Sequence, residues 1–600
     1  MFMNKAPQEL PPEVPARRSY FKPWLIIWAI VLVILLGLVL VLPGGPQHGG
    51  DWWIAMGVMA GVSFIAASLL VWLWRVCRWL CCWRNLRRAL FGVACVTTSI
   101  VLLYAEEDWR GRRDFNQLRH AGEARGEHFD VASLVPPPIP DDQNFAMTPI
   151  MFSAYGQYFD RAGHELKPRN TNLVNQLVLD YHGGNHQAIT NAVGDWRLAI
   201  PTDLTGYQQF YRTLAAKTNL FPVPLAPQSP AADVLLALSP FDPTIKELRR
   251  ASQLPYSRFP LEYSKADPAT ILLPHLAALN RSAIFLELRA IAELQTGQTS
   301  QALADVSLME KLINSVRTEP LLISHVLRIS MLRLMLQPVW EGWAAHRWSD
   351  AQLEALDVLL AHFDFVADYQ LALRGDRAMM IQEIFYLRDH PELYPDYIPI
   401  PSFNKSVSNF DFPMIVLSKT HLVPSGWYYQ NQLHCARLTE QYLAVADQET
   451  HTFNPAKAGQ AEAFQENEHR HISPFNTLEC IQLAWIEQLS APNGFTLPFA
   501  HAQSSVDQAR VASALERFRL VQGNYPDSLT ALAPHYLNPI PHDVIGGQPL
   551  HYHRTADGQF VLYSIGWNNH DDGGLVVATP GTTPGLNAAQ GDWVWRYPGK

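Results

Sequence analysis

Long uncharged apolar segments dominate the first hundred residues of the chain. The first runs from Pro23 to Pro43, the second from Trp52 to Trp74 and the third from Ala89 to Ala105. A helix that crosses a membrane needs about 20 predominantly apolar residues, so the first two segments predict transmembrane helices. The third segment is a few residues short. We expect it to cross as well, and a buried or interfacial helix is the alternative. Residues 23–105 are therefore predicted to hold three transmembrane helices.

Basic residues around these segments predict their orientation. The loop after the first segment has neither lysine nor arginine, whereas basic residues precede the first segment and separate the second from the third: Lys5, Arg17, Arg18, Lys22, Arg75, Arg78, Arg84, Arg87 and Arg88. Loops rich in lysine and arginine stay in the cytoplasm. Residues 1–22 are then a cytoplasmic tail, and the chain after about Glu106 lies outside. If the third segment does not cross, that part faces the cytoplasm instead.

A polar helix and a proline-rich spacer are predicted at residues 106–147. The stretch from Asp108 to Asp130 is typical of a polar helix, and the three prolines at 136–138 favour an extended, semi-rigid segment after it. We interpret Asp141 and Asp142 as a solvated turn, because no partner ligands for a metal are evident nearby.

Helical periodicity dominates residues 148–500, which we predict to form an α-helical domain. The pattern around Gly297 predicts two amphipathic helices joined by a turn, similar to one tetratricopeptide hairpin but without a repeat period. Helix-start signals recur along the domain: Asp242 before Pro243, and Ser349 three residues before Gln352. The predicted architecture is an irregular helical array or bundle, so that the fold class is mainly α.

The last part of the chain, residues 501–600, predicts a small α+β module. Ser505 and Gln508 form a second capping-box signature, and the apolar stripe that follows ends at Gly523, which can adopt the left-handed conformation. Alternating apolar residues on both sides of Asp557–Gly558 predict a β-hairpin.

The order of motifs in this module resembles the C-terminal globular part of the major pseudopilins of type II secretion. The shared features are a helix, Gly-x-Tyr-Pro at Gly523, a short helix, Pro-x-Asp at Pro541, and a hairpin that ends in Ser-x-Gly at Ser564. Pseudopilins carry one N-terminal span and a prepilin cleavage motif. Here three apolar segments precede the module and that motif is absent. The resemblance therefore implies that a pseudopilin-like module is reused in another setting.

Most of the remaining chain resembles an uncharacterised family of large membrane-anchored proteins from Verrucomicrobia and related phyla. The resemblance lies in stretches such as PPPIPDDQNFA, PYSRFPLEY and HRWSDAQL. It implies a bacterial envelope protein but no activity. Together with the predicted orientation, it implies a multi-pass protein of the inner membrane, with a cytoplasmic N-terminus and a large periplasmic domain.

The resemblance to pseudopilins also implies a structural calcium ion after the hairpin. Asn568 matches the family's acidic residue after Ser-x-Gly, and Asp571, Asp572 and Asp592 are the nearby carboxylates. Calcium takes six to eight oxygen ligands, which clustered carboxylates and carbonyls supply. These four residues are the predicted metal ligands, and a turn rich in Asn and Asp without a metal is the alternative. No other cofactor and no catalytic residue is predicted.

Charge and motifs argue against several function classes. The net charge is −9, and basic residues gather mainly between the apolar segments, which argues against nucleic-acid binding. No Walker A motif, dinucleotide-binding glycine motif or nucleophile elbow is present. Cys435 and Cys480 either pair or stay free thiols. Histidine-containing groups are interpreted as turn, exposed-loop and surface-strand residues: His182 with His186, Glu468 with His469 and His471, and His551 with His553.

Two functional hypotheses remain open. The first is a membrane-anchored scaffold or interaction protein of the bacterial envelope, linked to secretion by the pseudopilin-like module and contacting protein partners. The alternative is an extracytoplasmic hydrolase or glycan-binding protein with its site in the helical domain. That alternative requires a deep pocket with perturbed carboxylates or histidines.

Overall fold

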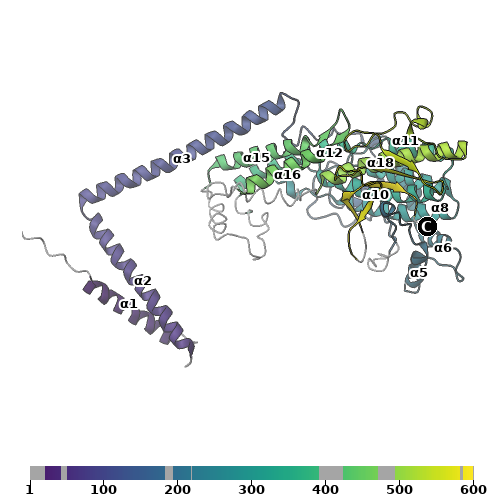
Figure 1. Ribbon diagram of the computed structural model, residues 1–600. Helices are drawn as coiled ribbons and strands as arrows, with labels where there is room; N and C mark the ends of the chain where they lie inside the picture. Colours follow the sequence, from purple (N-terminus) through teal and green to yellow (C-terminus); the bar gives the residue numbers. More distant parts are fainter. Residues whose placement is uncertain are drawn as a thin grey trace, which may run out of the picture. The chain divides into compact units, whose positions relative to one another are not determined.

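The computed structural model describes residues 21–41, 50–182, 193–217, 219–390, 393, 423–470, 494–581 and 585–598. It is mainly helical with a few small sheets, which confirms the predicted fold class at this level (Figure 1). The chain divides into two compact units, Met1–Glu106 and Glu107–Lys600.

The first unit contains helices α1 (Phe21–Val41) and α2 (Gly50–Leu80), which contact each other, and the beginning of α3 (Trp83–Glu123). Within the described residues, two helices are long and apolar enough to cross a membrane: α2 over Gly61–Leu80, and α3. The described apolar stretch of α1 is shorter, at Trp24–Ile34.

Helix α3 joins two elements that the sequence predicted separately. The predicted third span and the polar helix after it form one helix of 41 residues, because no proline interrupts the chain between them. The helix ends at Glu123, earlier than the predicted end at Asp130. Gly126 follows with φ +84°, a conformation that glycine adopts readily.

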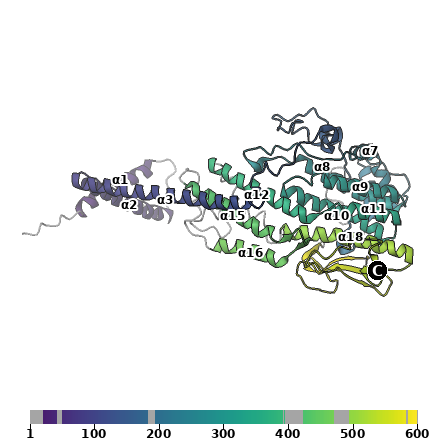
Figure 2. The same cartoon turned by 90° about the horizontal axis from the view of Figure 1, so that it is seen from above.

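Helices make up most of the second unit, as the helical periodicity of the sequence predicted. They are α4 (Pro149–Tyr155), α5 (Leu204–Ala215), α6 (Pro230–Leu238), α7 (Asp242–Ala251), α8 (Pro274–Gln295), α9 (Thr299–Asn314), α10 (Leu322–Ala344), α11 (Asp350–Leu360), α12 (Phe365–Asp389), α15 (Ser425–Leu443), α16 (Pro455–Arg470) and α18 (Thr496–Gln522). Figure 2 shows α10, α12 and α18 side by side, and these three helices contact one another pairwise.

Two local predictions in the helical region are confirmed. Helices α8 and α9 form a hairpin about Gly297, which has φ +80°. Helix α11 begins with the capping box: Ser349 Oγ accepts a hydrogen bond from Gln352 N at 3.3 Å, and Gln352 Oε1 accepts one from Ser349 N at 3.0 Å. These two bonds satisfy backbone N–H groups at the start of the helix that would otherwise need water as a partner.

Two other predicted helix caps are wrong, although a helix does begin at Asp242. Ser505 and Gln508 lie well inside α18, where the Ser505 hydroxyl donates to the carbonyl of His501 at 2.6 Å instead of capping. The helix begins earlier, at Thr496, and tolerates Pro498 because proline in the first turn removes no intrahelical hydrogen bond. Asp242 is the first residue of α7 and makes no capping bond, because the turn Ser239–Phe241 leads directly into the helix.

The C-terminal strands form two small antiparallel sheets. Strands β3 (His551–Arg554), β4 (Phe560–Ser564) and β7 (Trp593–Arg596) form one sheet in the order β3-β4-β7, and β5 (Val576–Ala578) pairs with β6 (Leu586–Gly591). The predicted hairpin between β3 and β4 is confirmed, and Gly558 in its turn has φ +82°. A short hairpin, β1 (Ala446–Asp447) with β2 (Thr452–Phe453), lies in the helical region.

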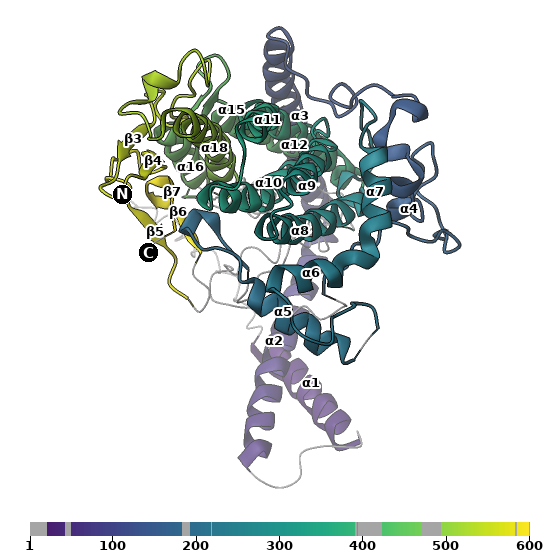
Figure 3. The same cartoon turned by 90° about the vertical axis from the view of Figure 1, so that its right-hand side faces the viewer.

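The three-stranded sheet packs on the helices, and Figure 3 shows it beside α18 and α10. Trp340 Nε1 on α10 donates to the carbonyl of Arg596 at 2.9 Å, and Gln508 Nε2 on α18 donates to the carbonyl of Trp593 at 2.9 Å. Trp595 is 1% exposed and its ring lies 5.3 Å from that of Trp196. The predicted domain boundary between residues 500 and 501 falls inside α18, so the sheet and the helices share one hydrophobic core.

Candidate functional site

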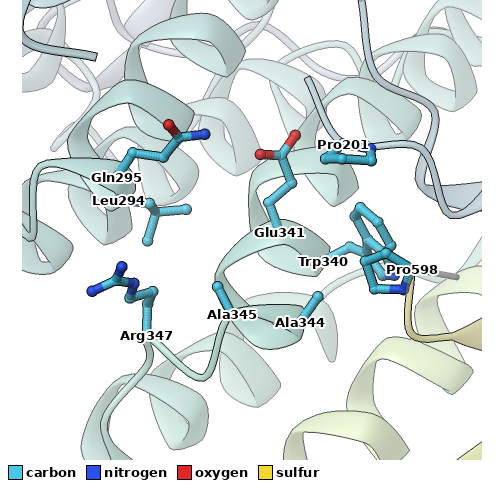
Figure 4. Close-up of a pocket in the computed structure, with 9 residues that line it drawn as sticks. All are labelled: Pro201, Leu294, Gln295, Trp340, Glu341, Ala344, Ala345, Arg347 and Pro598. Carbon is cyan, nitrogen blue, oxygen red and sulfur yellow. The ribbon is translucent and has the colours of Figure 1, made fainter. Parts of the chain in front are cut away.

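A pocket of about 370 Å³ lies between α8, α10 and two segments distant in sequence. Figure 4 shows the residues that line it: Pro201, Leu294, Gln295, Trp340, Glu341, Ala344, Ala345, Arg347 and Pro598. Most of the lining is apolar. Glu341 is the one carboxylate among these nine residues, and Arg347 is the one cation.

One wall of the pocket is a loop that Gln337 holds against α10. Gln337 Oε1 accepts a hydrogen bond from the backbone N–H of Trp196 at 2.6 Å, and its Nε2 donates to the carbonyl of Ile200 at 3.2 Å. Gly194 packs so closely on the same amide that a side chain there would overlap it. Gln337 is 2% exposed, so these bonds satisfy a buried amide and fix the loop that carries Pro201.

Glu341 is held by one of its two carboxyl oxygens. Its Oε1 accepts hydrogen bonds from the backbone N–H of Thr202 and from Gln337 Nε2, both at 2.9 Å. Figure 4 shows the carboxyl group and the amide of Gln295 pointing toward each other, with Pro201 on the other side of the carboxyl group. The side chain of Thr202 also interacts with this carboxyl group, which stands at the wall of the pocket.

Burial raises the pKa of Glu341, against the opposing effect of the hydrogen bonds from Gln337 and Thr202. The pKa of Glu287, on α8, is also raised, first by burial and then by the negative charge of Glu341. Arg333 opposes this rise only in part. The two carboxyl groups therefore hold protons more firmly than exposed ones, and Glu341 can donate a hydrogen bond or a proton to a ligand.

The chemistry of this pocket is limited by what surrounds Glu341. Arg347 lies on the side of the pocket away from Pro201 and Pro598 (Figure 4). Among the nine described lining residues there is no histidine, serine, cysteine or second carboxylate. The nine residues thus suit binding of a small amphipathic ligand better than a reaction that needs both an acid and a nucleophile.

Sequence reasoning did not identify Glu341. A single glutamate in an apolar helix normally indicates the exposed face of that helix. The one signal in the sequence is that Glu341 follows Gln337 by four residues, which puts both side chains on the same face of the helix. The loop that buries both residues comes from a segment about 140 positions earlier in the chain. No local pattern predicts that contact.

The four predicted calcium ligands lie in one loop region but use many of their oxygens internally. Asp592 is fully buried and accepts hydrogen bonds from the backbone N–H groups of Gly574 at 2.6 Å, Leu575 at 3.3 Å and Asp572 at 3.3 Å. Asn568 Nδ2 donates to Asp572 Oδ2 at 2.7 Å.

Asp571 Oδ1 accepts hydrogen bonds from the Tyr563 hydroxyl at 3.1 Å and from the backbone N–H of Gly573 at 2.9 Å. Among the described residues, no group of three or more His, Cys, Asp and Glu side chains is arranged to hold a metal ion. The calcium site stays a prediction.

The other residues considered from the sequence have ordinary environments where they are described. His551 stacks on Tyr563 across the β3–β4 pair, with ring centroids 4.9 Å apart. His182 N donates to Asp180 Oδ1 in a turn. Burial raises the pKa of the Cys435 thiol to about 12. His186, His471 and Cys480 lie outside the described residues, and the side chains of Glu468 and His469 are likewise not described.

No family model, curated protein or solved structure matches the chain. The resemblances to pseudopilins and to the membrane-anchored bacterial family therefore stay predictions, and the functional argument rests on the fold and the pocket.

Proposed function

We propose that the chain is a membrane-anchored scaffold or interaction protein of the bacterial envelope. The first unit anchors it, and the second unit presents a broad helical surface with the pseudopilin-like module to protein partners. In this proposal the protein crosses the inner membrane more than once, its N-terminus is cytoplasmic, and the second unit is periplasmic.

One observation supports this proposal most directly. Helix α3 runs unbroken from exposed apolar residues such as Phe91, which is 73% exposed, to a segment buried in the second unit. In that segment, Gly111 packs against the backbone of Gly426 on α15, and Asp108 Oδ1 accepts a hydrogen bond from Gly426 N at 2.6 Å. A folded unit attached by such a helix is a stable platform for a partner.

Salt bridges also hold the end of α3 in the second unit. Glu127 forms ion pairs with Arg374 at 3.0 Å and with Arg377 at 2.7 Å, and Arg377 is buried. These contacts tie the residues just after α3 to α12, at the centre of the helical array. Because Arg377 is buried, loss of Glu127 would leave a buried charge without this partner, which is strongly destabilising.

The test is crosslinking of intact membranes followed by purification of the full chain and mass spectrometry. Stoichiometric recovery of envelope proteins, including secretion components, is the expected result. Recovery of the chain alone after crosslinking would contradict the proposal. A protease-accessibility assay on sealed inner-membrane vesicles tests the topology, since a periplasmic second unit is protected in inside-out vesicles.

The pocket at Glu341 favours one alternative: an extracytoplasmic protein that binds or hydrolyses a small ligand such as a glycan fragment. A carboxyl group with a raised pKa that lines a pocket is a candidate proton donor. The test compares the full chain with Glu341→Gln in ligand-binding and hydrolase screens. Activity that Glu341→Gln abolishes, with an unchanged melting temperature, would favour this alternative over the scaffold.

A further inference from the structure

We propose that α3 carries a binding site for the headgroup phosphate of an anionic phospholipid, formed by Arg112 and Arg113 beside Trp109. The inference rests on the proposed membrane anchoring, since it requires a bilayer at the apolar part of the same helix. It assigns a ligand to a helix face that the anchoring itself does not use.

The site lies on one face of the helix. Trp109, Arg112, Arg113 and Asn116 are spaced i, i+3, i+4 and i+7, and they line a pocket of about 410 Å³ together with Asp108. This spacing brings two guanidinium groups and an indole ring to the same patch of surface. A phosphodiester fits such a patch, because arginine donates paired hydrogen bonds to phosphate oxygens.

A different face of α3 packs against the second unit. Gly111, Phe115 and Gly122 are buried, and they recur at helical spacing on the side roughly opposite to Trp109. This packing does not account for Trp109 and Arg113, and Arg112 meets the second unit at its ring contact with Tyr429. Arg112 and Arg113 are both exposed.

The two arginines also lack strong acidic partners. Arg110, one turn earlier, is neutralised by Glu107 at 2.6 Å, whereas the nearest carboxylate to Arg113 is that of Asp114, at 3.9 Å. Within the described part of the chain, no carboxylate lies within ion-pair distance of Arg112. Two positive charges therefore remain available to an anion.

Asp108 brings a carboxylate to the rim of the pocket, but one of its oxygens is already used. Asp108 Oδ1 accepts the hydrogen bond from Gly426 N. The guanidinium of Arg112 lies 5.4 Å from the ring of Tyr429, which holds it beside the pocket by a cation–π contact. The net charge of the patch stays positive.

Trp109 indicates that the anion belongs to a lipid. Its side chain is 62% exposed, and it follows the apolar segment that ends at Ala105 by four residues, about 6 Å along a helix. Tryptophan gathers at that depth, where lipid headgroups meet water. The guanidinium of Arg113 lies 5.1 Å from the Trp109 ring, so charge and ring are presented together.

The predicted orientation strengthens the case. In that orientation this face lies on the outer side of the membrane, where arginine next to a span is disfavoured by the positive-inside rule. The rule therefore does not account for Arg112 and Arg113 as topology signals. Phosphate binding gives them a role on that side.

The test is native mass spectrometry of the full chain in detergent micelles doped with phosphatidylglycerol or phosphatidylcholine. The wild type should retain phosphatidylglycerol preferentially, and Arg112→Gln with Arg113→Gln should reduce that preference by about fivefold per arginine. The matched control is Arg119→Gln with Arg125→Gln, which removes the same charge from residues paired with Glu123 and Glu440. The control should keep the wild-type preference.

Three results would overturn the inference: equal retention of the two lipids by the wild type, an unchanged preference in the double variant, or loss of bound phosphatidylglycerol when inorganic phosphate is added. The last would identify a site for a free anion. Carbonate extraction of membranes separates this inference from the proposed function. A chain that resists extraction but shows no lipid preference refutes only the lipid site, and a chain that is extracted refutes both.

Discussion

Glu516 is a buried carboxylate that three side chains hold at once. It accepts hydrogen bonds from Arg519 Nη2 at 2.6 Å and from the Tyr525 hydroxyl at 2.6 Å, and it pairs with His346 Nδ1 at 2.8 Å. Its side chain is 1% exposed. Burial alone would raise the pKa of Glu516, but these three donors outweigh burial and lower the pKa to about 2.

The first prediction concerns this network. Because the pKa of Glu516 falls from 4.5 to about 2 on folding, its stabilisation is complete above pH 4.5 and is lost as the pH falls toward 2. Glu516→Gln should lower the free energy of unfolding by about 3 kcal/mol at pH 7 and by much less near pH 2. Denaturant unfolding of the full chain in detergent at both pH values measures the difference.

The control for this experiment is Glu247→Gln. Glu247 pairs with Arg250 on the exposed surface of α7, where an ion pair adds little stability. Equal losses in the two variants, or a loss at Glu516 that does not depend on pH, would contradict the assignment.

The second prediction concerns Asp592. Asp592→Asn replaces a carboxylate that accepts backbone N–H groups by an amide with one acceptor oxygen fewer. We therefore expect the free energy of unfolding to fall by about 1–3 kcal/mol without any calcium present, measured by thermal unfolding.

The predicted calcium site is tested in the same thermal unfolding experiments. Millimolar calcium should raise the melting temperature of the wild type and not that of Asp592→Asn. An equal effect on both proteins would show that Asp592 is not a ligand.

At the scale of single elements, turns and helix caps that depend on neighbouring residues were predicted correctly from the sequence. Helix ends that depend on contacts with distant segments were missed. The turn at Gly297, the cap at Ser349 and the hairpin at Gly558 are local, and the structure confirms them. The capping signature at Ser505 failed because α18 is buried on most of its circumference over its first five turns. A helix end can be predicted from the sequence where polar residues face solvent, and it cannot where the start of the helix is buried in the core.

The third prediction tests the contact between α3 and α15. A Cβ added at Gly426 would overlap the backbone carbonyl of Glu107, and a backbone atom cannot rotate away. We expect Gly426→Ala to cost about 1–3 kcal/mol through overpacking. Gly459→Ala on α16 is the matched control, since nothing lies within 4 Å of the added atom. It should be neutral or slightly stabilising, because alanine favours helix.

Thermal unfolding of the two variants, followed by the tryptophan signal, compares them directly. If Gly426→Ala were as stable as the wild type, the close approach of α3 and α15 would not exist in solution. The attachment described under the proposed function would then lose its main support.

At the scale of the whole molecule, the second unit depends on contacts between its beginning, middle and end. The loop 194–202, helix α10 and strand β7 meet around Trp196, Trp343 and Trp595. The predicted helical composition and the C-terminal hairpin follow from periodicity. The pocket at Glu341 and the shared core do not, since both need segments more than a hundred positions apart to be placed together.

The fourth prediction follows from α18. Most of its residues from Thr496 to Glu516 are buried, and the helix contacts α10, α11 and α12 as well as β7. Residues 501–600 produced alone should therefore lack a stable tertiary structure, whereas residues 107–600 should unfold cooperatively. Proton NMR dispersion and near-ultraviolet circular dichroism distinguish the two. A well-dispersed spectrum from residues 501–600 would show that the module folds independently.

The shared core also sets the order of events during synthesis. Helices α8 to α12 leave the ribosome well before α18 and the C-terminal strands, and at translation rates of about 5–20 residues per second they wait several seconds for the segments that cover them. During that interval apolar residues such as Trp340 and Trp343, which are buried in the folded unit, are exposed to solvent. A premature stop anywhere before Trp593 leaves them permanently uncovered, so truncated chains should be degraded by proteases faster than the full chain.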